Sequence, residues 1–269
     1  MSVNLKFRKS GHGPALIILH GLYGSSDNWI SIARKLEERF TVYIPDLRNH
    51  GHSPHTTTHT YQDMVGDLCQ FFKDHHIPKA IILGHSMGGK LAMMFAAEYP
   101  ELTNGLIVAD ITPKSYHRAG QSLKSVLQHE IILEMMEELN LVAVSSRQEI
   151  DSFLAERLQN STLRQFLIKN IHRNKEGYFE WKINVPALRY ALVSITSDVN
   201  SEWFDDRKPI LSYPVTFIRG LNSDYISDQD LPIIKGIYPE ARIIDIPNAG
   251  HWLHAEQPEK FIEAVLTSV

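Results

Sequence analysis

The chain has a single cysteine among 269 residues, which excludes a disulfide framework within it. It also lacks any apolar run near the roughly 18 residues of a membrane-spanning helix, and its charged first ten residues lack the apolar segment of a signal peptide. Basic residues are not in excess, since 27 Lys and Arg stand against 31 Asp and Glu, a net charge of −4. We therefore expect a cytoplasmic protein, with Cys69 buried in a helix and with neither nucleic acid nor a membrane as partner.

Short apolar runs alternate with helical patterns at both ends of the chain. The runs at 15–19, 40–44, 80–83, 106–109, 215–218 and 241–246 are typical of buried parallel strands. From about 114 to 206 the apolar residues instead recur at helical spacing. The sequence predicts an α/β fold: a mostly parallel, eight-stranded sheet flanked by helices from residues 1–113 and 207–269, with a helical cap inserted at 114–206.

The pentapeptide Gly84-His85-Ser86-Met87-Gly88 follows the run at 80–83 and precedes a helical pattern at 89–99. A serine on a tight turn from strand to helix needs small neighbours, because a Cβ there would collide with backbone and block the hydroxyl. The helix would also direct its unpaired N–H groups and the positive end of its dipole at a developing oxyanion. This context favours Ser86 as a nucleophile; the plainer alternative is that Ser86 only caps the helix.

Candidate oxyanion donors follow the first apolar strand. The run at 15–19 leads into the loop HGLYG at 20–24, which we interpret as a glycine loop at the end of a central strand. Acyl-transfer hydrolases take one backbone N–H from such a loop and another from the residue after the nucleophile. Here these donors would be Leu22 and Met87, although a plain turn also explains the glycines.

A candidate general base lies after the last expected strand. Among 14 histidines, His251 is distinguished by its position, since it follows the strand at 241–246 and comes directly after Gly250. A loop there can reach over the end of the sheet toward a serine far back in the sequence. In serine hydrolysis such a histidine takes the hydroxyl proton and returns it to the leaving group.

Two acids are candidates to orient that histidine. Asp224 lies in the loop after the strand at 215–218, the usual place, but the expected spacing lands on Ser223 instead. Asp110 directly follows the strand at 106–109, a position that a minority of such enzymes use, and the apolar strand would keep it partly buried. We favour Asp110 and keep Asp224 as the alternative acid. A helix N-cap would be the purely structural explanation of Asp110.

The string DLRNHGHS at 46–53 follows another expected strand, and we interpret it as scaffold in which Asp46 and Arg48 pair. Histidines crowd in this region at His50, His52, His55 and His59. A metal site is the alternative, but the H-E-x-x-H and cysteine spacings of specific metal sites are absent. We therefore expect no metal ion.

Five segments together carry a family resemblance: HGLYGSSDNW from His20, DLRNHGHS from Asp46, GHSMGGK from Gly84, VADITP from Val108 and NAGHWLHAEQP from Asn248. They resemble the alpha/beta-hydrolase superfamily, and within it the small serine esterases and thioesterases of the YbfF type. The resemblance implies Ser86 as nucleophile, His251 as base and Asp110 as acid, with backbone donors at Leu22 and Met87. It implies hydrolysis of a short-chain acyl ester or acyl-coenzyme A through an acyl-enzyme, without a cofactor.

Some cap residues are expected to line the acyl pocket. The candidates are Trp181, Tyr190 and Trp203, then Met135, Met136 and Leu139. Lys90, Arg118 and Lys124 are basic residues that would meet phosphates if the leaving group were coenzyme A.

Other functions are compatible with the same motifs. Related folds with a Ser, His and acid triad cleave C–C bonds or eliminate pyruvate in menaquinone synthesis, and a hydrolase-like receptor would bind a ligand with little turnover. The partner expected here is a small acyl ester or thioester, and both a monomer and a homodimer remain open.

Overall fold

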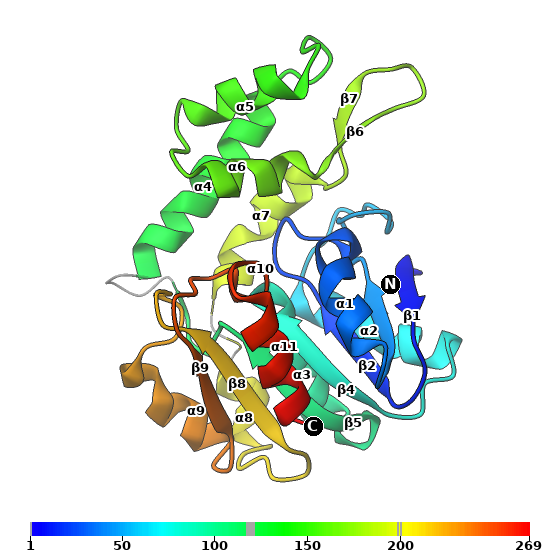
Figure 1. The fold of residues 1–269 in the computed structure, drawn as a ribbon, viewed down its shortest axis with the longest axis vertical. Helices are drawn as coiled ribbons and strands as arrows, with labels where there is room; N and C mark the ends of the chain where they lie inside the picture. The colour runs from blue at the N-terminus through cyan, green and yellow to red at the C-terminus, as the bar shows by residue number, and fades with distance from the viewer. Residues whose placement is uncertain (1, 117–121, 198, 200) are drawn as a thin grey trace.

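The structure, a computed structural model, describes residues 2–116, 122–197, 199 and 201–269. It is built on a sheet with the strand order β1-β3-β2-β4-β5-β8-β9 (Figure 1). The strands are β1 (Phe7–Ser10), β2 (Ala15–Leu19), β3 (Thr41–Pro45), β4 (Ala80–His85), β5 (Thr103–Ala109), β8 (Val215–Gly220) and β9 (Arg242–Ile246). Neighbouring strands run parallel except for β1 and β3. The predicted α/β class with a mostly parallel sheet is confirmed.

The expected eight strands are one too many, since the sheet has seven strands within the described residues. Only β1 precedes β2, because Gly11 and Gly13, both with positive φ, turn the chain directly from the first strand into the second. The turn packs tightly, and a Cβ on Gly11 would lie 2.3 Å from the carbonyl oxygen of Phe40. The segment between β1 and β2 thus has no room for a further strand.

Helices cover both faces of the sheet, so the strands are buried on both sides. Alternate side chains of β2 enter two different hydrophobic clusters, Leu16 and Ile18 in one, Ile17 and Leu19 in the other. The first face is covered by α1 (Ile30–Leu36), α10 (Leu253–Glu256) and α11 (Pro258–Thr267). The second is covered by α2 (Tyr61–Asp74), α3 (Met87–Glu98) and α9 (Leu231–Ile237). Two-sided burial explains why the strands read as continuous apolar runs in the sequence.

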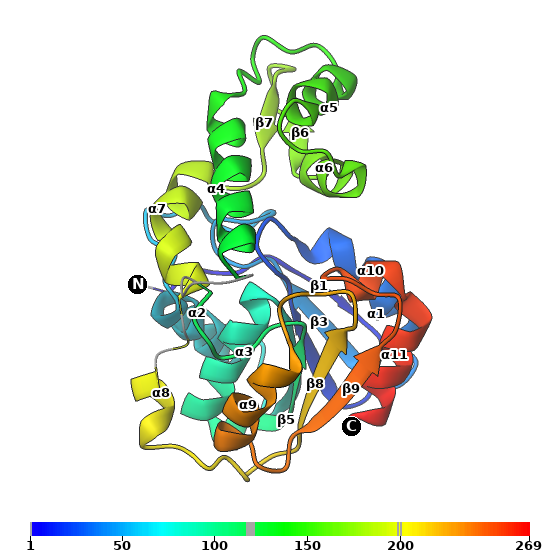
Figure 2. The ribbon, with the colours of Figure 1, turned by 90° about the vertical axis from the view of Figure 1, so that its left-hand side faces the viewer.

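The chain between β5 and β8 forms a separate layer above the sheet (Figures 1 and 2). This layer contains α4 (Ser122–Glu138), α5 (Arg147–Ala155), α6 (Ser161–Ile168) and α7 (Val185–Thr196). The chain then descends to α8 (Ser201–Asp205), whose Phe204 packs against Tyr238 beside the sheet, with ring centroids 6.1 Å apart. The long α4 and α7 pack against each other.

This inserted layer is not purely helical, which corrects the expectation for 114–206. An antiparallel hairpin of β6 (Ile171–Arg173) and β7 (Phe179–Trp181) interrupts the helices. Its turn is closed by Asn174, whose side-chain oxygen accepts from the backbone N–H groups of Glu176 and Tyr178, and by Gly177 at φ +89°. Strands of three residues are too short to produce a readable alternation of polar and apolar positions.

Three short 3-10 helices complete the described structure, at Ser26–Trp29, Pro100–Leu102 and Asp228–Asp230. Cys69 is buried in α2, as expected. Within the described ranges, no helix combines the length and apolar character needed to cross a membrane.

Candidate active site

Ser86 stands on the turn between β4 and α3. Its backbone has φ +54° and ψ −121°, a strained conformation for a residue with a side chain. The glycines on either side make this turn possible, because a Cβ on Gly84 would lie 2.1 Å from the carbonyl oxygen of Gly88. A Cβ on Gly88 would lie 2.3 Å from the carbonyl oxygen of Leu19 in β2. The strand-turn-helix geometry expected from the pentapeptide is present.

The structure brings Ser86, His251 and Asp110 together from three distant parts of the chain. His251, in the loop between β9 and α10, has its Nε2 atom 3.0 Å from Ser86 Oγ and its Nδ1 atom 2.8 Å from Asp110 Oδ2. Asp110 follows β5 directly and is completely buried. These contacts place the imidazole between a hydroxyl and a carboxylate.

Asp110 is fixed by neighbouring strand ends. Its backbone N–H donates to the carbonyl oxygen of Ile218 over 2.8 Å, and its Oδ1 accepts from the N–H of Gly220 over 3.1 Å. Ser223 Oγ donates to Oδ2, the same atom that faces His251. The hydroxyl of Ser223 therefore occupies the place where the usual spacing would put the acid.

Asp224 does not contact His251 among the described residues, and it lines an open groove beside the site. Its charge raises the pKa of Asp110, although less than burial does. Of the two candidate acids, the structure brings Asp110 to the histidine.

Burial sets the protonation of the pair. It lowers the pKa of His251 below the usual 6.5, so the imidazole is neutral at pH 7 and its Nε2 atom can accept a proton. Burial raises the pKa of Asp110, and the hydrogen bonds from Ser223 and Gly220 oppose that rise. Those two donors help keep a buried carboxylate available to the imidazole.

The two candidate oxyanion donors lie on either side of Ser86. Met87 is the first residue of α3. The N–H groups of Gly89 and Lys90 donate to the carbonyl oxygen of Ser86 and begin the hydrogen bonds within the helix. The N–H of Met87 comes before these residues, at the helix end where N–H groups have no partner within the helix. Leu22 lies in the loop after β2, which packs closely on the serine: a Cβ on Gly21 would lie 3.2 Å from Ser86 Cβ.

Buried histidines hold the loop that contains Leu22. His20 Nδ1 faces the carbonyl oxygen of Gly21 at 2.9 Å, and its Nε2 accepts from the N–H of Leu47. His50 Nε2 accepts from the N–H of Tyr23 over 3.3 Å. These bonds fix the backbone immediately before and after Leu22.

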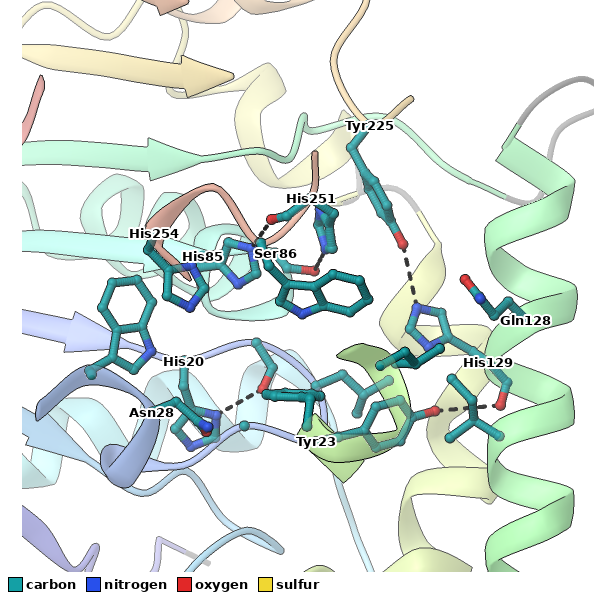
Figure 3. A pocket seen from close by; sticks show the side chains of 18 residues that line it. His20, Tyr23, Asn28, His85, Ser86, Gln128, His129, Tyr225, His251 and His254 are labelled. Carbon is teal, nitrogen blue, oxygen red and sulfur yellow. Dashed lines mark hydrogen bonds between the residues drawn. The ribbon is translucent and has the colours of Figure 1, made fainter. Parts of the chain in front are cut away.

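Ser86 opens into a cavity of about 110 Å³, which we call the large cavity. Figure 3 shows Ser86, His251, Tyr225 and His129 around it. The loops at the strand ends form one wall, and α4 and α6 form the other with Gln128, His129, Ile132, Leu163 and Phe166.

Two of these side chains escaped the sequence analysis. Tyr225 stacks on His251 with ring centroids 3.8 Å apart, and its hydroxyl lies 3.5 Å from His129 Nε2. The sequence could have pointed to Tyr225, because it directly follows the candidate acid Asp224. His129 belongs to a helical pattern without a motif, so the sequence held no signal for it.

The expected pocket residues of the cap mostly lie elsewhere. Tyr190 is 90% exposed. The indole N–H groups of Trp181 and Trp203 donate to the carbonyl oxygens of Met136 and Met94. Met135, Met136 and Leu139 are buried in the hydrophobic core. Their helical spacing reflects packing within the inserted layer rather than contact with a ligand.

The string at 46–53 is scaffold, but its pairing differs from the prediction. Arg48 binds Asp67 of α2 through Nε and Nη2, at 2.6 and 2.8 Å, whereas Asp46 accepts from the N–H groups of Ser26 and His52. Asp46 and Arg48 therefore hold different segments. The turn at Gly51 packs directly on the Asp46 carboxylate, since a Cβ there would lie 2.4 Å from it.

Of the crowded histidines, only His50 and His59 lie side by side among the described residues, with ring centroids 5.3 Å apart. His52 and His55 are exposed, whereas His50 and His59 are buried. Across the described ranges, no group of three His, Cys, Asp or Glu side chains is arranged to hold a metal ion.

Of the three basic candidates for phosphate binding, the structure describes the side chain of Lys90 alone. Lys90 is buried and donates to the carbonyl oxygens of Lys114 and Ser197, so it is neither solvated nor free to meet a phosphate. Arg118 lies outside the described residues, as does the side chain of Lys124.

Comparisons with known proteins show the family to which this chain belongs. The family profile described as alpha/beta hydrolase fold matches residues 14–128. The chain is 34% identical to sn-1-specific diacylglycerol lipase ABHD11 of Danio rerio, over 97% of this chain and 80% of that protein. It is 32% identical to Esterase YbfF of Escherichia coli, over 93% of this chain and 91% of that protein. A solved structure of a marine microorganism esterase has a TM-score of 0.94 and 43% identity, with both chains fully covered. The chain therefore belongs to the alpha/beta-hydrolase family, among its carboxylesterases.

Proposed function

We propose that this protein hydrolyses short-chain acyl esters through an acyl-enzyme, with Ser86 as nucleophile, His251 as general base and Asp110 as the orienting acid. One observation carries the proposal: a neutral, largely buried imidazole has Nε2 at 3.0 Å from Ser86 Oγ and Nδ1 at 2.8 Å from Asp110 Oδ2. That order of contacts is what proton abstraction from a serine requires. The esterase names of two relatives support the same chemistry.

In the first half-reaction Ser86 Oγ attacks the ester carbonyl carbon while His251 Nε2 takes the hydroxyl proton. The carbonyl oxygen becomes an oxyanion, which the N–H groups of Leu22 and Met87 stabilise. Each such donor contributes about 3 kcal/mol in the transition state. His251 then gives the proton to the leaving alcohol oxygen as the C–O bond breaks.

In the second half-reaction a water molecule attacks the acyl-enzyme. His251 takes a proton from the water and returns it to Ser86 Oγ as the acid is released. Asp110 keeps Nδ1 protonated and Nε2 facing the serine, and it stabilises the imidazolium that forms twice in each cycle. The bonds from Ser223 and Gly220 hold the carboxylate in that orientation.

We propose that residues 114–206 act as a cap over Ser86. Helices α4 and α6 supply the wall of the large cavity that faces the serine, and this wall shields the serine from bulk water on the side of the inserted layer. The same groups would also hydrolyse a thioester, because the thiolate is a better leaving group than the alkoxide of an ester. Acyl-coenzyme A substrates are therefore included in the test.

The test measures hydrolysis of p-nitrophenyl butyrate and butyryl-coenzyme A by the purified protein and three variants. Ser86→Ala is expected to abolish turnover, and Asp110→Asn to lower kcat by about 10⁴-fold through the wrong imidazole tautomer. Asp224→Asn is the matched control, since it makes the same change in the carboxylate that does not contact His251, and its rate is expected to stay within a few-fold of wild type.

Turnover that survives Ser86→Ala, or a wild type that turns over neither substrate, would refute acyl-enzyme hydrolysis. C–C bond cleavage or ligand binding without turnover would then be the functions to test. A larger loss in Asp224→Asn than in Asp110→Asn would refute only the assignment of the acid.

A further inference from the structure

A second, smaller cavity of about 30 Å³ also opens at Ser86, and we call it the inner cavity. Leu22, Ser86, His129 and Tyr225 line both cavities. Among the described residues, His251 lines only the large cavity of the two, and Met87 lines only the inner one. The serine thus stands between two spaces of different size and different chemical surroundings.

The tetrahedral carbon formed at Ser86 has four substituents, and the surroundings of the serine assign each a direction. One substituent is Ser86 Oγ itself, and the oxyanion must face the N–H groups of Leu22 and Met87. The leaving oxygen must receive a proton from His251 Nε2, so it lies on the side of the large cavity. The acyl carbon chain takes the remaining direction, away from His251.

We infer that the inner cavity holds the acyl chain and the large cavity holds the alcohol, so that the substrates are short-chain acyl esters of bulkier, largely apolar alcohols. This inference rests on the proposed hydrolysis through Ser86. One water-sized group needs roughly 10–15 Å³, so the inner cavity of about 30 Å³ admits about two to three groups beyond the carbonyl carbon. Acyl groups of two to about four carbons fit that space.

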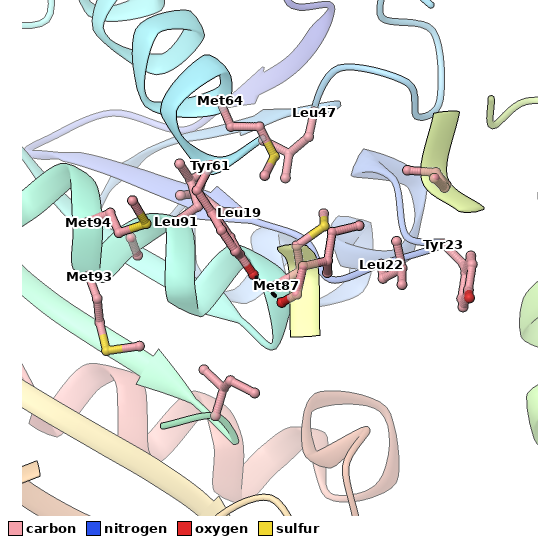
Figure 4. Close-up of a cluster of buried hydrophobic side chains, with 14 of the residues drawn as sticks. Leu19, Leu22, Tyr23, Leu47, Tyr61, Met64, Met87, Leu91, Met93 and Met94 are labelled. Carbon is pink, nitrogen blue, oxygen red and sulfur yellow. Dashed lines mark hydrogen bonds between the residues drawn. The ribbon is translucent and has the colours of Figure 1, made fainter. Parts of the chain in front are cut away.

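The far wall of the inner cavity is braced against expansion. Tyr61 of α2 donates its hydroxyl to the carbonyl oxygen of Ile195 over 2.9 Å, and Tyr116 donates to the carbonyl oxygen of Tyr225 over 2.9 Å. Figure 4 shows Tyr61, Met87 and Leu22, which line the inner cavity, in one hydrophobic cluster. A longer acyl chain would have to break hydrogen bonds between buried groups.

The large cavity, in contrast, has an outlet. His251, Tyr225, Gln128 and Leu163 line both the large cavity and an adjoining groove of about 630 Å³. An alcohol that extends beyond the large cavity can continue into this groove and leave through it. The apolar walls, which include Trp29, favour an apolar alcohol.

Two isoleucines provide a matched test, because both are buried and both lie on helices of the inserted layer. Ile195 of α7 lines the inner cavity, and Ile132 of α4 lines the large cavity. The assays measure kcat/KM for p-nitrophenyl acetate, butyrate, hexanoate and octanoate, then for ethyl, benzyl and 1-naphthyl acetate. The first series varies only the acyl chain, and the second varies only the alcohol.

Wild type is expected to lose at least about tenfold in kcat/KM between butyrate and octanoate. Ile195→Ala should raise the octanoate-to-butyrate ratio about tenfold or more, because it adds room for further methylene groups. Ile132→Ala should leave that ratio within about twofold and change the preference among the three acetates instead. If Ile195→Ala does not fold, Ile195→Val and the wild-type series make the same test on a smaller scale.

A flat wild-type acyl series, or an acyl ratio that responds to Ile132→Ala and not to Ile195→Ala, would overturn the assignment of the cavities. Ser86→Ala separates this failure from failure of the proposed function. If hydrolysis depends on Ser86 but the ratios move the wrong way, only the assignment is wrong. If hydrolysis does not depend on Ser86, the proposed function itself fails.

Discussion

Lowering the pH from 7.5 to 5.0 should destabilise this protein strongly, because it buries neutral histidines. His85 and His59 are both buried, and burial lowers the pKa of each from 6.5 to about 3. In the unfolded chain each imidazole binds a proton near pH 6.5, whereas in the folded protein each stays neutral until about pH 3. The contribution of these two histidines to the free energy of unfolding is therefore fully present above pH 6.5 and is lost as the pH falls from 6.5 toward 3.

The size of the loss follows from the two pKa values. At pH 5.0 the unfolded imidazole is about 1.5 pH units below its pKa, which corresponds to about 2 kcal/mol for each histidine. His85 and His59 together account for about 4 kcal/mol, a large part of the 5–15 kcal/mol typical of whole proteins. The pKa values of His50 and His254 are also lowered by burial, so their contributions have the same sign.

The Asp110–His251 pair adds little to this loss. Burial raises the pKa of the carboxyl and lowers that of the imidazole, so the two changes act on stability in opposite directions. The expected effect therefore belongs to the other buried histidines.

The assay is urea unfolding at pH 7.5 and pH 5.0, for wild type, His85→Gln and His12→Gln. The glutamine Nε2 group can still donate to the carbonyl oxygen of His251, which His85 Nε2 contacts at 2.7 Å, but it does not titrate. His85→Gln should lose about 2 kcal/mol less than wild type between the two pH values. His12 is exposed, so His12→Gln should lose as much as wild type. Equal losses in wild type and His85→Gln would refute the reasoning.

Three further predictions concern the turn, the stack and the base. Gly88→Ala should lower the free energy of unfolding by about 1–3 kcal/mol or more, because the new Cβ would collide with the backbone of Leu19. Gly66→Ala in α2 should raise it by about 1 kcal/mol, because no atom lies within 4 Å of the new Cβ. Thermal unfolding that ranks the two variants the other way would contradict this. Tyr225→Leu should lower kcat roughly tenfold, because the His251 imidazolium loses the aromatic ring stacked on it. Tyr225→Phe keeps the ring and should have the kcat of wild type. Equal kcat values for the two variants would show that the stacked ring does not contribute to catalysis. The acid limb of kcat/KM should lie near pH 7, because activity needs both a neutral His251 and an ionised Asp110, and burial lowers the pKa of His251 but raises that of Asp110 to about 7. A midpoint well below pH 6.5 would contradict this.

Local patterns predicted the parts of the site that depend on neighbours in sequence. The turn at Ser86 was predictable because the glycines at 84 and 88 act within a few residues of it, where a Cβ would strike backbone. The five apolar runs that correspond to β2, β3, β4, β5 and β8 were readable as strands because helices on both faces of the sheet bury nearly all of their residues. The sixth run forms the edge strand β9, where Arg242 and Asp245 are exposed. Both signals arise from short-range sterics and burial.

The parts that depend on tertiary contacts were not predictable. Tyr190 and Phe166 are both aromatic residues on helices of the inserted layer, yet Tyr190 is 90% exposed and Phe166 lines the large cavity. Helical spacing indicates which residues lie on the same face of a helix, but it does not indicate whether that face contacts the core, a cavity or solvent. Arg48 likewise binds Asp67, nineteen residues away, rather than the nearby Asp46.

The choice between Asp110 and Asp224 shows why sequence spacing alone could not decide the acid. β5 and β8 are neighbouring parallel strands, with Ala109 opposite Ile218, so the loops after them begin at the same edge of the sheet. A carboxylate placed after either strand can therefore approach the same imidazole. Here the loop after β8 contributes the N–H of Gly220 and the hydroxyl of Ser223, and both donate to the carboxylate that comes from β5. Because donors and acid are interchangeable between two adjacent strand ends, only the three-dimensional contacts identify which loop holds the charge.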